Sequence, residues 1–338
     1  MRYFRPIPQT DAAAPPGAHR IGGSWAWFDH VEILERGAEP VIAPVDAVPE
    51  EWLAALNAPR QPILGFDWQK PVVMGILNVT PDSFSDGGQH AALDDAVAHA
   101  QGMAAAGADL LDVGGESTRP GAAFVPAEAE IARTAPVISA VVAAGVQAPI
   151  SIDTRKAPVA EAALTAGARL INDVSGFTFD QNLAQLAAKA QAPVCVMHAL
   201  GDPATMQDDP RYDDVLLDVY DFLAERIAAL ETQGIARSRI IADPGIGFGK
   251  TLAHNLTLLR RISLFHGLGV PILLGASRKR FIGTLGGVAK ADARVSGSVA
   301  VAQMALGQGV QIVRVHDVAE TAQAIALWGA LVSGAAYE

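Results

Sequence analysis

From residue 70 onward the sequence alternates between short apolar segments and longer segments with helical spacing. Alanine- and leucine-rich stretches, such as 93–106 and 215–231, separate the apolar runs. Runs that are apolar almost throughout are typical of parallel strands buried on both faces. Eight such units within 70–338 predict an α/β fold, a (β/α)8 TIM barrel. The runs are VVMGIL (72–77), DLLDVG (109–114), PISID (149–153), RLIND (169–173), PVCVMH (193–198), RIIADP (239–244), PILLGAS (271–277) and VQIVRVH (310–316).

The first 69 residues differ from the rest and are interpreted as a small N-terminal appendage to a barrel domain at 70–338. They contain four of the 5 tryptophans, many prolines and an alternating segment, HVEIL, at 30–34. A short helix is expected around residues 50–56. Residues 1 to about 20 are expected to be mobile, as chain termini often are. The appendage would seal the bottom of the barrel or support dimerisation.

Composition restricts the class of partner. A formal net charge of −11 argues against nucleic acid and against an anionic membrane surface. The single cysteine, Cys195, excludes an intrachain disulfide and a multi-cysteine metal site, and it is expected to be a buried strand residue. The N-terminus has no continuous apolar core, and residues 295–310 are too short and too interrupted to span a bilayer. The expectation is a soluble cytoplasmic protein.

The segment ADPGIGFGKT at 242–251 looks like a phosphate loop, but its spacing is wrong. A Walker A loop needs a glycine five residues before Gly249, and that position is Pro244, which has no N–H to donate. The dinucleotide pattern fails as well, because its third glycine falls on Lys250. The sequence therefore excludes a P-loop ATPase.

Nearly every predicted strand ends in a side chain that can ionise or form hydrogen bonds. A single residue of this kind is often a helix cap. A full circle of them points instead to the C-terminal rim of a barrel, where the active sites of such folds lie. We therefore predict the functional site at this rim. The strand-end residues are Asn78, Glu116, Asp153, Asn172, Asp173, His198, Asp243, Ser277, Arg314 and His316.

Three of these residues suit a flat heterocycle with an amidine-like edge. The carboxylates of Asp153 and Asp243 can each accept two parallel N–H bonds, and the amide of Asn172 supplies both a donor and an acceptor. The alternative is that each side chain only caps a loop, which would explain one of them better than all three. A mismatched ring would leave buried polar groups unpaired, so such a site would discriminate strongly.

Basic residues follow the last two predicted strands, where barrels frequently bind phosphate. Ser277 to Arg280 follow the seventh, and Arg314 and His316 end the eighth. The alternative, a solvated basic turn, applies best to Arg280. Two clusters in an acidic protein predict an anionic ligand. The loops at 78–88 and 114–126 are interpreted as lids.

Two residues of these loops are candidate contacts to a phosphorylated ligand. Arg119 would add positive charge, and Asn78 could complete the shell of a Mg²⁺ ion held mostly by phosphate and water. The sequence has no nucleophile elbow and no H-E-x-x-H motif. His198 lacks a partner at metal-ligand spacing. These features favour a substitution whose leaving group carries its own charge.

Taken in order, eight motifs make the chain resemble dihydropteroate synthase over essentially all of 70–338. This family joins 6-hydroxymethyl-7,8-dihydropterin diphosphate to p-aminobenzoate and releases pyrophosphate, and it has the barrel fold. The resemblance implies a transferase of folate synthesis, a Mg²⁺ cofactor, a homodimer and a sulfonamide target. The motifs are GILNVTPDSFSDGG, LLDVGGESTRPGA, ISIDTRK, INDVSG, TMQDDPRYDDV, DPGIGFGKT, GASRKRFIG and IVRVHDV.

The resemblance also implies roles for individual residues. It makes Asp153, Lys279 and Arg119 the catalytic residues and Asn78 the metal contact. The arylamine slot would be lined by Phe248 and Pro120. The implied substrate-binding residues are Thr118, Asp153, Asn172, Met197, Asp243, Phe248, Gly275, Ser277, Lys279, Arg314 and His316.

One departure and two alternatives remain open. The family usually has a methionine and a polar residue where this chain has Ala199 and Leu200, a change that would reshape the aminobenzoate slot. A methyltetrahydrofolate-binding methyltransferase would share the pterin-reading residues, but it does not need the two basic clusters. A catalytically silent paralogue would bind pterin without turnover. Similarity of fold alone cannot decide function.

Overall fold

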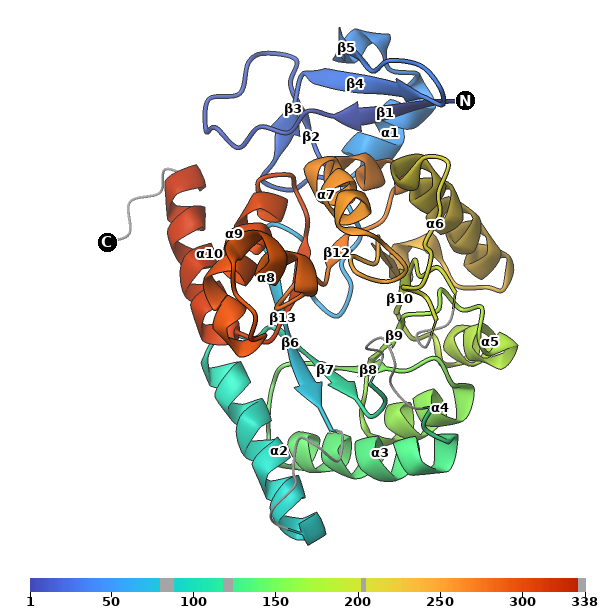
Figure 1. Cartoon of the computed structure of the whole chain (residues 1–338), viewed down its shortest axis with the longest axis vertical. Coiled ribbons are helices and arrows are strands. Elements are labelled where there is room, and N and C mark those ends of the chain that lie inside the picture. Colours follow the sequence, from blue (N-terminus) through green and yellow to red (C-terminus); the bar gives the residue numbers. More distant parts are fainter. Residues whose placement is uncertain (80–87, 118–123, 202–204, 334–338) are drawn as a thin grey trace.

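Eight parallel strands form one curved sheet at the centre of the computed structural model (Figure 1). The structure describes residues 1–79, 88–117, 124–201 and 205–333. The sheet order is β11-β10-β9-β8-β7-β6-β13-β12, and a bridge between Ala242 and Ile272 joins its two ends. The predicted TIM barrel is therefore confirmed. The strands are β6 (Val72–Asn78), β7 (Leu110–Gly114), β8 (Ile150–Asp153), β9 (Leu170–Asp173), β10 (Val194–Met197), β11 (Ile240–Asp243), β12 (Leu273–Leu274) and β13 (Ile312–Val315).

Helices surround this sheet and alternate with its strands (Figure 1). The predicted helical segment 215–231 lies in α6, and 93–106 lies in α2 except for its last residue, Ala106. Several helices end at a glycine with positive φ, such as Gly107 and Gly167, where the chain turns toward the next strand. The helices are α2 (Gly88–Ala105), α3 (Ala127–Ala143), α4 (Ala157–Ala166), α5 (Gln181–Ala190), α6 (Val215–Thr232), α7 (Leu252–Arg260), α8 (Arg280–Gly286), α9 (Val295–Leu306) and α10 (Val318–Ser333), with short 3₁₀ helices η3 (Arg237–Arg239), η4 (Ile262–Leu268) and η5 (Asp292–Arg294).

Strand β12 is shorter than the apolar run at 271–277 predicts. A hydrogen bond to a side chain takes the place of one of the backbone hydrogen bonds that would have extended the strand. Pro271 has no N–H to donate. The N–H of Ile272 bonds to Oε1 of Gln311 across 2.8 Å instead of to a neighbouring strand. Only two residues therefore have regular strand pairing.

Apolar side chains close the bottom of the barrel, at the N-terminal ends of its strands. Ile63 and Trp68, which precede β6, are both buried and pack against inward-facing strand residues. This part of the chain therefore covers the end of the barrel opposite the predicted rim. The inward-facing strand residues are Val72, Met74, Leu110, Leu170, Cys195, Ile241, Leu273 and Ile312.

The N-terminal residues form a second, antiparallel sheet of order β1-β4-β5 (Figure 1). The alternating segment HVEIL falls in β4, and the predicted helix at 50–56 falls in α1. Within the first 20 residues, Arg2–Pro6 form β1, which pairs with β4 at five positions. The elements are β1 (Arg2–Pro6), β2 (His19–Arg20), β3 (Trp27–Phe28), β4 (His30–Glu35), β5 (Val41–Pro44), η1 (Val45–Ala47) and α1 (Glu50–Asn57).

Buried polar contacts join this N-terminal sheet to the barrel. Glu32 accepts hydrogen bonds from Arg5 of the same sheet, at 2.5 Å, and from Arg261 Nη2 at the end of α7, at 2.9 Å. The hydroxyl of Tyr3 donates to Asp221 of α6 across 2.9 Å. Because Glu32 bonds to a cation on each side of the junction, it links the two parts and helps to fix their orientation.

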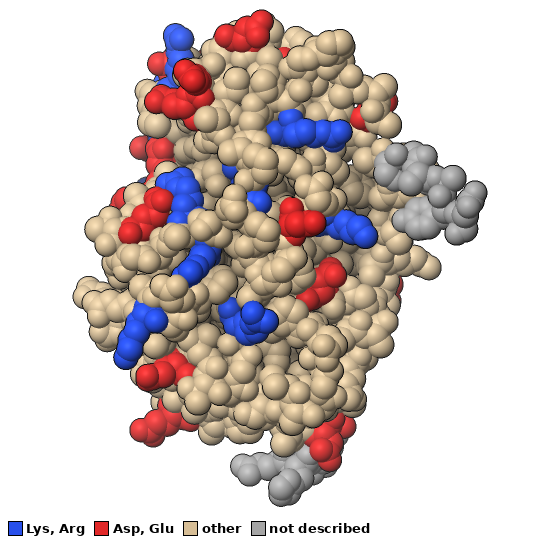
Figure 2. All heavy atoms as spheres, turned by 180° about the vertical axis from the view of Figure 1, so that it is seen from behind, with Lys and Arg blue, Asp and Glu red and all other residues tan. Residues whose placement is uncertain are grey.

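The surface charges and the helices were compared with the prediction that the protein binds neither nucleic acid nor a membrane. Figure 2 shows Lys and Arg side chains interspersed with Asp and Glu on one face, without a large field of one sign there. Within the described ranges, none of the helices has the length and apolar character needed to cross a membrane. In α9 the small residue Gly297 allows close packing against α8, because a Cβ there would lie 2.3 Å from Cγ2 of Ile282.

Candidate active site at the C-terminal rim

Strand alternation places the predicted site residues in one layer inside the barrel. Side chains two positions apart point to the same face of a strand. Asn172, for example, lies two residues after Leu170, which belongs to the apolar bottom layer. The interior therefore has an apolar floor with a polar layer above it. In β8, Ile150 and Ile152 pack in the outer core, so Ser151 and Asp153 face inward. The residues of this upper layer are Asp112, Asp153, Asn172, Met197, Asp243, Gly275 and Arg314.

Arg314 is held between two carboxylates of this layer. Its Nε donates to Oδ2 of Asp112 across 2.5 Å, and its Nη2 donates to Oδ2 of Asp153 across 2.7 Å. Asn172 Nδ2 also donates to Oδ2 of Asp112, across 3.0 Å. Asp112 therefore orients both the arginine and the amide. Sequence reasoning missed Asp112 because it considered strand ends, although a carboxylate inside the apolar run DLLDVG is itself a signal.

The protonation of Asp153 reflects its surroundings. Burial raises its pKa to about 7; Arg314 opposes this rise, and the negative charge of Asp112 adds to it. Two carboxylates share one guanidinium in this buried site, so the pair keeps a proton up to about pH 7 and carries one negative charge without a full counter-charge above it. The ionised pair could therefore stabilise a positively charged ligand or transition state next to Asp153.

Asp243 ends β11 at a turn that only glycine can form. Its Oδ1 accepts a hydrogen bond from the N–H of Gly245 across 2.7 Å. Gly245 has a φ of 68°, and a Cβ there would lie 1.8 Å from the carbonyl oxygen of His198. On the other side, a Cβ on Gly275 would lie 3.6 Å from Asp243 Oδ2. The two glycines thus let the backbone approach the carboxylate closely and leave space beside it.

Lys279 and Phe248 lie together over the Asp243 loop. The ammonium of Lys279 donates to the carbonyl oxygen of Ile246 and lies 4.4 Å from the centroid of the Phe248 ring. Burial lowers the pKa of Lys279 to about 8, although the charge of Asp243 opposes this shift. The site therefore contains a lysine that loses its proton at about pH 8, well below the pH at which a lysine ordinarily does so.

The basic segment after β12 divides into two parts. Ser277 Oγ accepts from the backbone N–H of His316 across 3.2 Å and lies 3.1 Å from its Nδ1, so these two residues from adjacent strands form one unit. Arg278 instead forms an ion pair with Asp317 and has a φ of 57°. Arg280 begins α8. Arg278 is thus committed to a structural contact, whereas Ser277 and His316 remain at the rim.

Asp173 and His198 have structural contacts. Asp173 points away from the interior and caps its own loop, accepting from the backbone N–H groups of Ser175 and Phe177, each across 2.7 Å. His198 Nδ1 lies 2.8 Å from Nζ of Lys250, and both side chains are buried. Burial lowers the pKa of His198 to about 2, so it is the neutral acceptor in this pair.

Lys250 was not predicted from the sequence. It joins the end of β10 to the Asp243 loop, which brings the unusual residue Leu200 against that loop. A Cβ on Gly249 would lie 2.6 Å from that of Leu200. Met197, at the end of β10, is buried, and its Cγ would lie 3.3 Å from a Cβ on Gly245.

Some predicted residues fall outside the described ranges. These are Thr118, Arg119 and Pro120, together with most of the loop at 78–88. Asn78 is described: it is exposed at the end of β6, and its side chain has no hydrogen-bond partner among described residues. Atom Asn78 Oδ1 and Asp153 Oδ2 lie 3.8 Å and 3.7 Å from the position of a Cβ on Gly114. Both oxygens therefore face one region of the rim.

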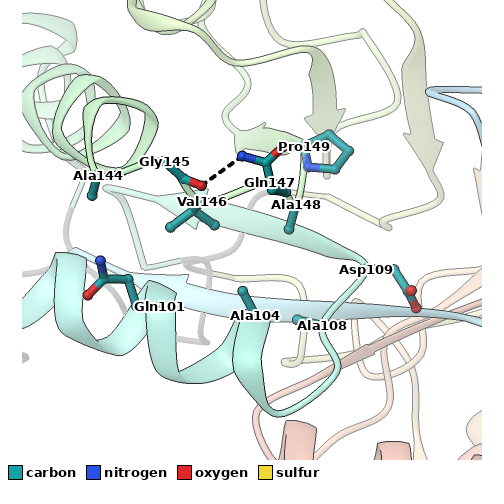
Figure 3. A pocket seen from close by; sticks show the side chains of 10 residues that line it. All are labelled: Gln101, Ala104, Ala108, Asp109, Ala144, Gly145, Val146, Gln147, Ala148 and Pro149. Carbon is teal, nitrogen blue, oxygen red and sulfur yellow. Dashed lines mark hydrogen bonds between the residues drawn. The ribbon is translucent and has the colours of Figure 1, made fainter.

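Two hollows lie at the opposite end of the barrel. One, of about 530 Å³, is lined by residues between α2 and the start of β8, including Asp109 and Gln147 (Figure 3). The other, of about 760 Å³, is lined by Ile63, Leu64 and residues that precede β9, β10 and β11. Because both lie at the N-terminal ends of strands, neither belongs to the rim site.

Comparison with known proteins matches this arrangement. The family model described as "Pterin binding enzyme" matches residues 74–316. A dihydropteroate synthase of Escherichia coli (strain K12) is 49% identical over 267 residues, covering 79% of this chain and 94% of that protein.

Solved structures of dihydropteroate synthases are also similar to this chain. A Xanthomonas albilineans dihydropteroate synthase with 4-aminobenzoic acid superposes with a TM-score of 0.75 at 48% identity, covering 81% of this chain and 98% of that one. The same organism's enzyme in complex with 7,8-dihydropteroate gives 0.73 at 45% identity, covering 81% and 98%. The barrel and its polar rim thus define a pterin-binding enzyme. Within that class, the chain belongs to the dihydropteroate synthase family.

Proposed function

We propose that this enzyme condenses 6-hydroxymethyl-7,8-dihydropterin diphosphate with p-aminobenzoate, giving 7,8-dihydropteroate and pyrophosphate. The observation that carries the proposal is the layer of Asp153, Asn172 and Asp243 inside the barrel mouth, with the cations Lys279 and Arg314 beside it. Relatives at 45–49% identity carry the same family name. The Xanthomonas albilineans enzyme has been solved with 4-aminobenzoic acid and in complex with 7,8-dihydropteroate.

The pterin is proposed to bind across the upper layer of the barrel. Asp243 would accept hydrogen bonds from its amidine-like edge, and Asn172 would read a neighbouring donor and acceptor. The space beside Asp243 that Gly275 leaves open suits a flat ring. Lys279 lies over the same loop and would hold the ring's carbonyl oxygen or a phosphate oxygen.

The pyrophosphate and the arylamine are proposed to lie above that layer. Ser277 and His316 form one unit at the rim, and the Arg314 guanidinium has donors beyond the two that bind carboxylates. Thr118 and Arg119 are proposed as further contacts. Met197 and Phe248 would line the aminobenzoate slot, with Phe248 fixed by its contact with Lys279.

A dissociative substitution fits these surroundings. The C–O bond to pyrophosphate breaks first, and its electron pair leaves with the pyrophosphate. The pterin ring delocalises the resulting positive charge, which the Asp153 carboxylate stabilises. The amine nitrogen then forms the new C–N bond and loses a proton. Because p-aminobenzoate is a weak nucleophile, it gives little help in displacing the pyrophosphate directly. A route in which pyrophosphate leaves before the amine attacks therefore has the lower barrier.

Magnesium is proposed as the cofactor. The donor set fits it, because Asn78 has an amide oxygen without a partner among the described residues, and Mg²⁺ takes its other ligands from phosphate and water. Among the described residues, His, Cys, Asp and Glu form no group of three that could hold a metal without the substrate. When bound, the ion would supply charge stabilisation to the departing pyrophosphate.

We also propose a cytoplasmic homodimer. Three large apolar side chains are exposed on α9 and α10: Met304 at 45%, Leu327 at 64% and Leu331 at 85%. An apolar surface of this kind is typical of association between copies. Sedimentation at several protein concentrations tests this proposal, and a monomer at all of them would contradict it.

The reaction is tested by mass spectrometric detection of 7,8-dihydropteroate. The purified enzyme is mixed with both substrates and Mg²⁺, and a parallel sample contains EDTA. We expect product in the first sample and little in the second. A silent paralogue would bind the pterin diphosphate without forming product in either sample.

A further inference from the structure

The Asp243 loop, residues 244–251 between β11 and α7, is held in shape by side chains. Four successive backbone carbonyl groups of this loop accept hydrogen bonds from side-chain donors. Buried or half-buried carbonyl groups need such partners, and in a helix or a sheet the backbone itself supplies them. The shape of this loop therefore depends on its four donors. The pairs, donor first, are Lys279 and Ile246, Gln207 and Gly247, Lys250 and Phe248, and Tyr212 and Gly249.

Lys250 is the donor that also reaches the barrel wall. Its Nζ donates to the carbonyl oxygen of Phe248 across 3.0 Å and lies 2.8 Å from Nδ1 of His198. The carbonyl oxygen of His198 is a third acceptor, 3.4 Å away. An ammonium group has three N–H donors, so one can be directed at each of these atoms. The side chain of Lys250 thus joins the Asp243 loop to the end of β10.

The two partners of Lys250 lie at the proposed aminobenzoate slot. Phe248 is itself a proposed contact in that slot, and its ring lies 4.4 Å from Nζ of Lys279. Met197, the second proposed contact, directly precedes His198 at the end of β10. One buried lysine therefore fixes the backbone beside both side chains.

His198 is a rigid anchor for this lysine. Its imidazole packs edge-on against the ring of Phe222 in α6, with centroids 4.8 Å apart and an interplanar angle of 83°. Its backbone N–H donates to the carbonyl oxygen of Asp243 across 3.1 Å and so continues the pairing of β10 with β11. Because His198 is fixed by α6 and by the sheet, Lys250 holds Phe248 to a part of the molecule that does not move with the loop.

Lys250 is a costly residue to keep for stability alone. It is 3% exposed, and within the described ranges its hydrogen bonds go to uncharged acceptors, not to a carboxylate. Burial lowers its pKa, and the positive charge of Lys279 lowers it further. Burying a charged group without a counter-charge costs free energy, whereas an apolar side chain of similar length would fill the same space without that cost. What the lysine adds is its three directed hydrogen bonds.

The pterin side of the loop has contacts of its own. Asp243 is paired with Met197 in the sheet, and its Oδ1 accepts from the N–H of Gly245 across 2.7 Å. Burial raises the pKa of Asp243, and Lys279 opposes this rise more than Lys250 does. Asp243 therefore keeps its position and most of its positive surroundings when Lys250 is removed.

We propose that Lys250 is a positioning residue for p-aminobenzoate, because it holds the backbone of Phe248 against the end of β10 that carries Met197. The inference rests on the proposed function, since Phe248 and Met197 are proposed contacts of that substrate. A change at Lys250 should weaken the binding of p-aminobenzoate and leave that of the pterin diphosphate nearly unchanged. A purely structural lysine would affect both substrates alike or neither.

The test compares Lys250→Met with Arg60→Met. Arg60 is a matched control because it is also a buried cation, 7% exposed, whose hydrogen bonds among described residues go to carbonyl oxygens. It donates to the carbonyl oxygens of Ala55 and His266, each across 2.8 Å, at the end of the molecule away from the rim. For each variant the KM of both substrates and the unfolding temperature are measured.

We expect Lys250→Met to raise the KM for p-aminobenzoate about tenfold, the size of effect that follows from losing one charge-assisted hydrogen bond beside the slot. The KM for the pterin diphosphate should change less than about twofold. Arg60→Met should lower the unfolding temperature without changing either KM. Equal KM changes for both substrates in Lys250→Met, or no change in either, would overturn the inference.

A second variant covers the case in which Lys250→Met does not fold. Tyr212→Phe removes only the hydroxyl group that donates to the carbonyl oxygen of Gly249 across 2.8 Å, next to Phe248. The same unequal effect is expected at about threefold, because a neutral hydrogen bond is lost. Its control is Tyr3→Phe, which removes a hydroxyl bonded to Asp221 in the junction with the N-terminal sheet and should change neither KM.

The two proposals fail in different ways. If Tyr212→Phe has the same KM values as Tyr3→Phe, the Asp243 loop does not position p-aminobenzoate and the inference is wrong. Absence of product in the wild-type enzyme would instead contradict the proposed function.

Discussion

Arg314 donates from Nη2 to Oδ2 of Asp153 across 2.7 Å and so joins the ends of β13 and β8 across the barrel interior. Its Nε binds Asp112 of β7 as well. One guanidinium thus fixes two carboxylates that would otherwise repel each other. This arrangement keeps Asp153 in place while leaving the pair one positive charge short.

Replacing Asp112 by asparagine should lower kcat/KM about tenfold to a hundredfold, because Arg314 and Asn172 both lose their shared carboxylate. Steady-state kinetics with both substrates measures this. Asp109→Asn is the matched control: Asp109 lies just before the same strand, at the far end of the barrel, and accepts from the N–H of Val73 across 2.8 Å. An equal loss in both variants would refute the role of Asp112.

Stability should depend on the pH through Asp153. Its folded pKa of about 7 lies above the ordinary value of 3.8. Between these values the folded state binds a proton that the unfolded state lacks, so the free energy of unfolding falls as the pH rises from about 4 to about 7. The loss is about 1.4 kcal/mol for each pKa unit at most.

Denaturant unfolding at pH 5 and at pH 8 tests this, using wild type and Asp153→Asn. The variant should lose less stability between the two pH values than the wild type does. If both lose the same amount, Asp153 is ionised throughout and the assigned cause is wrong.

Activity should decline on the alkaline side because of Lys279. Its folded pKa of about 8 means that the ammonium is present below that pH and lost above it. We expect kcat/KM to fall as the pH rises through about 8. In Lys279→Met the activity should be low and this alkaline limb should disappear. If kcat/KM of the variant still falls as the pH rises through about 8, the fall is caused by the titration of another group.

The turn after Asp243 should not tolerate a side chain. Gly245→Ala would place its Cβ 1.8 Å from the carbonyl oxygen of His198 at a φ of 68°. We expect a loss of about 3 kcal/mol or more, together with loss of activity. Gly286→Ala is the control, because a Cβ there meets nothing within 4 Å. Similar melting temperatures for the two variants would contradict the account of this turn.

Much of the fold could be predicted from the sequence because the barrel repeats one simple pattern. Each apolar run produced a strand, and polar strand ends such as Asp153 and Asp243 lie on one rim. The run at 271–277 was misleading, because a single distant side chain, Gln311, takes the N–H that would have extended β12. Such a replacement leaves no periodic trace in the sequence.

The site itself was only partly predictable for a similar reason. The residue types at the strand ends indicated a ligand with an anionic group and a flat ring. They did not indicate which charged side chains of the protein pair with each other. Asp112 lies within an apolar run, and its partner Arg314 is 202 residues away. The buried pair of Lys250 and His198 likewise depends on how two loops meet. Pairings of this kind arise from the closed barrel and not from local spacing.

The most direct test of the central claim is pyrophosphate release by the purified enzyme with the pterin diphosphate and Mg²⁺. The release is measured with and without p-aminobenzoate, in wild type and in Asp243→Asn. The account predicts release that depends on p-aminobenzoate in the wild type and is strongly reduced in the variant. Pterin binding without any release, or release that is equal in the absence of p-aminobenzoate, would contradict it.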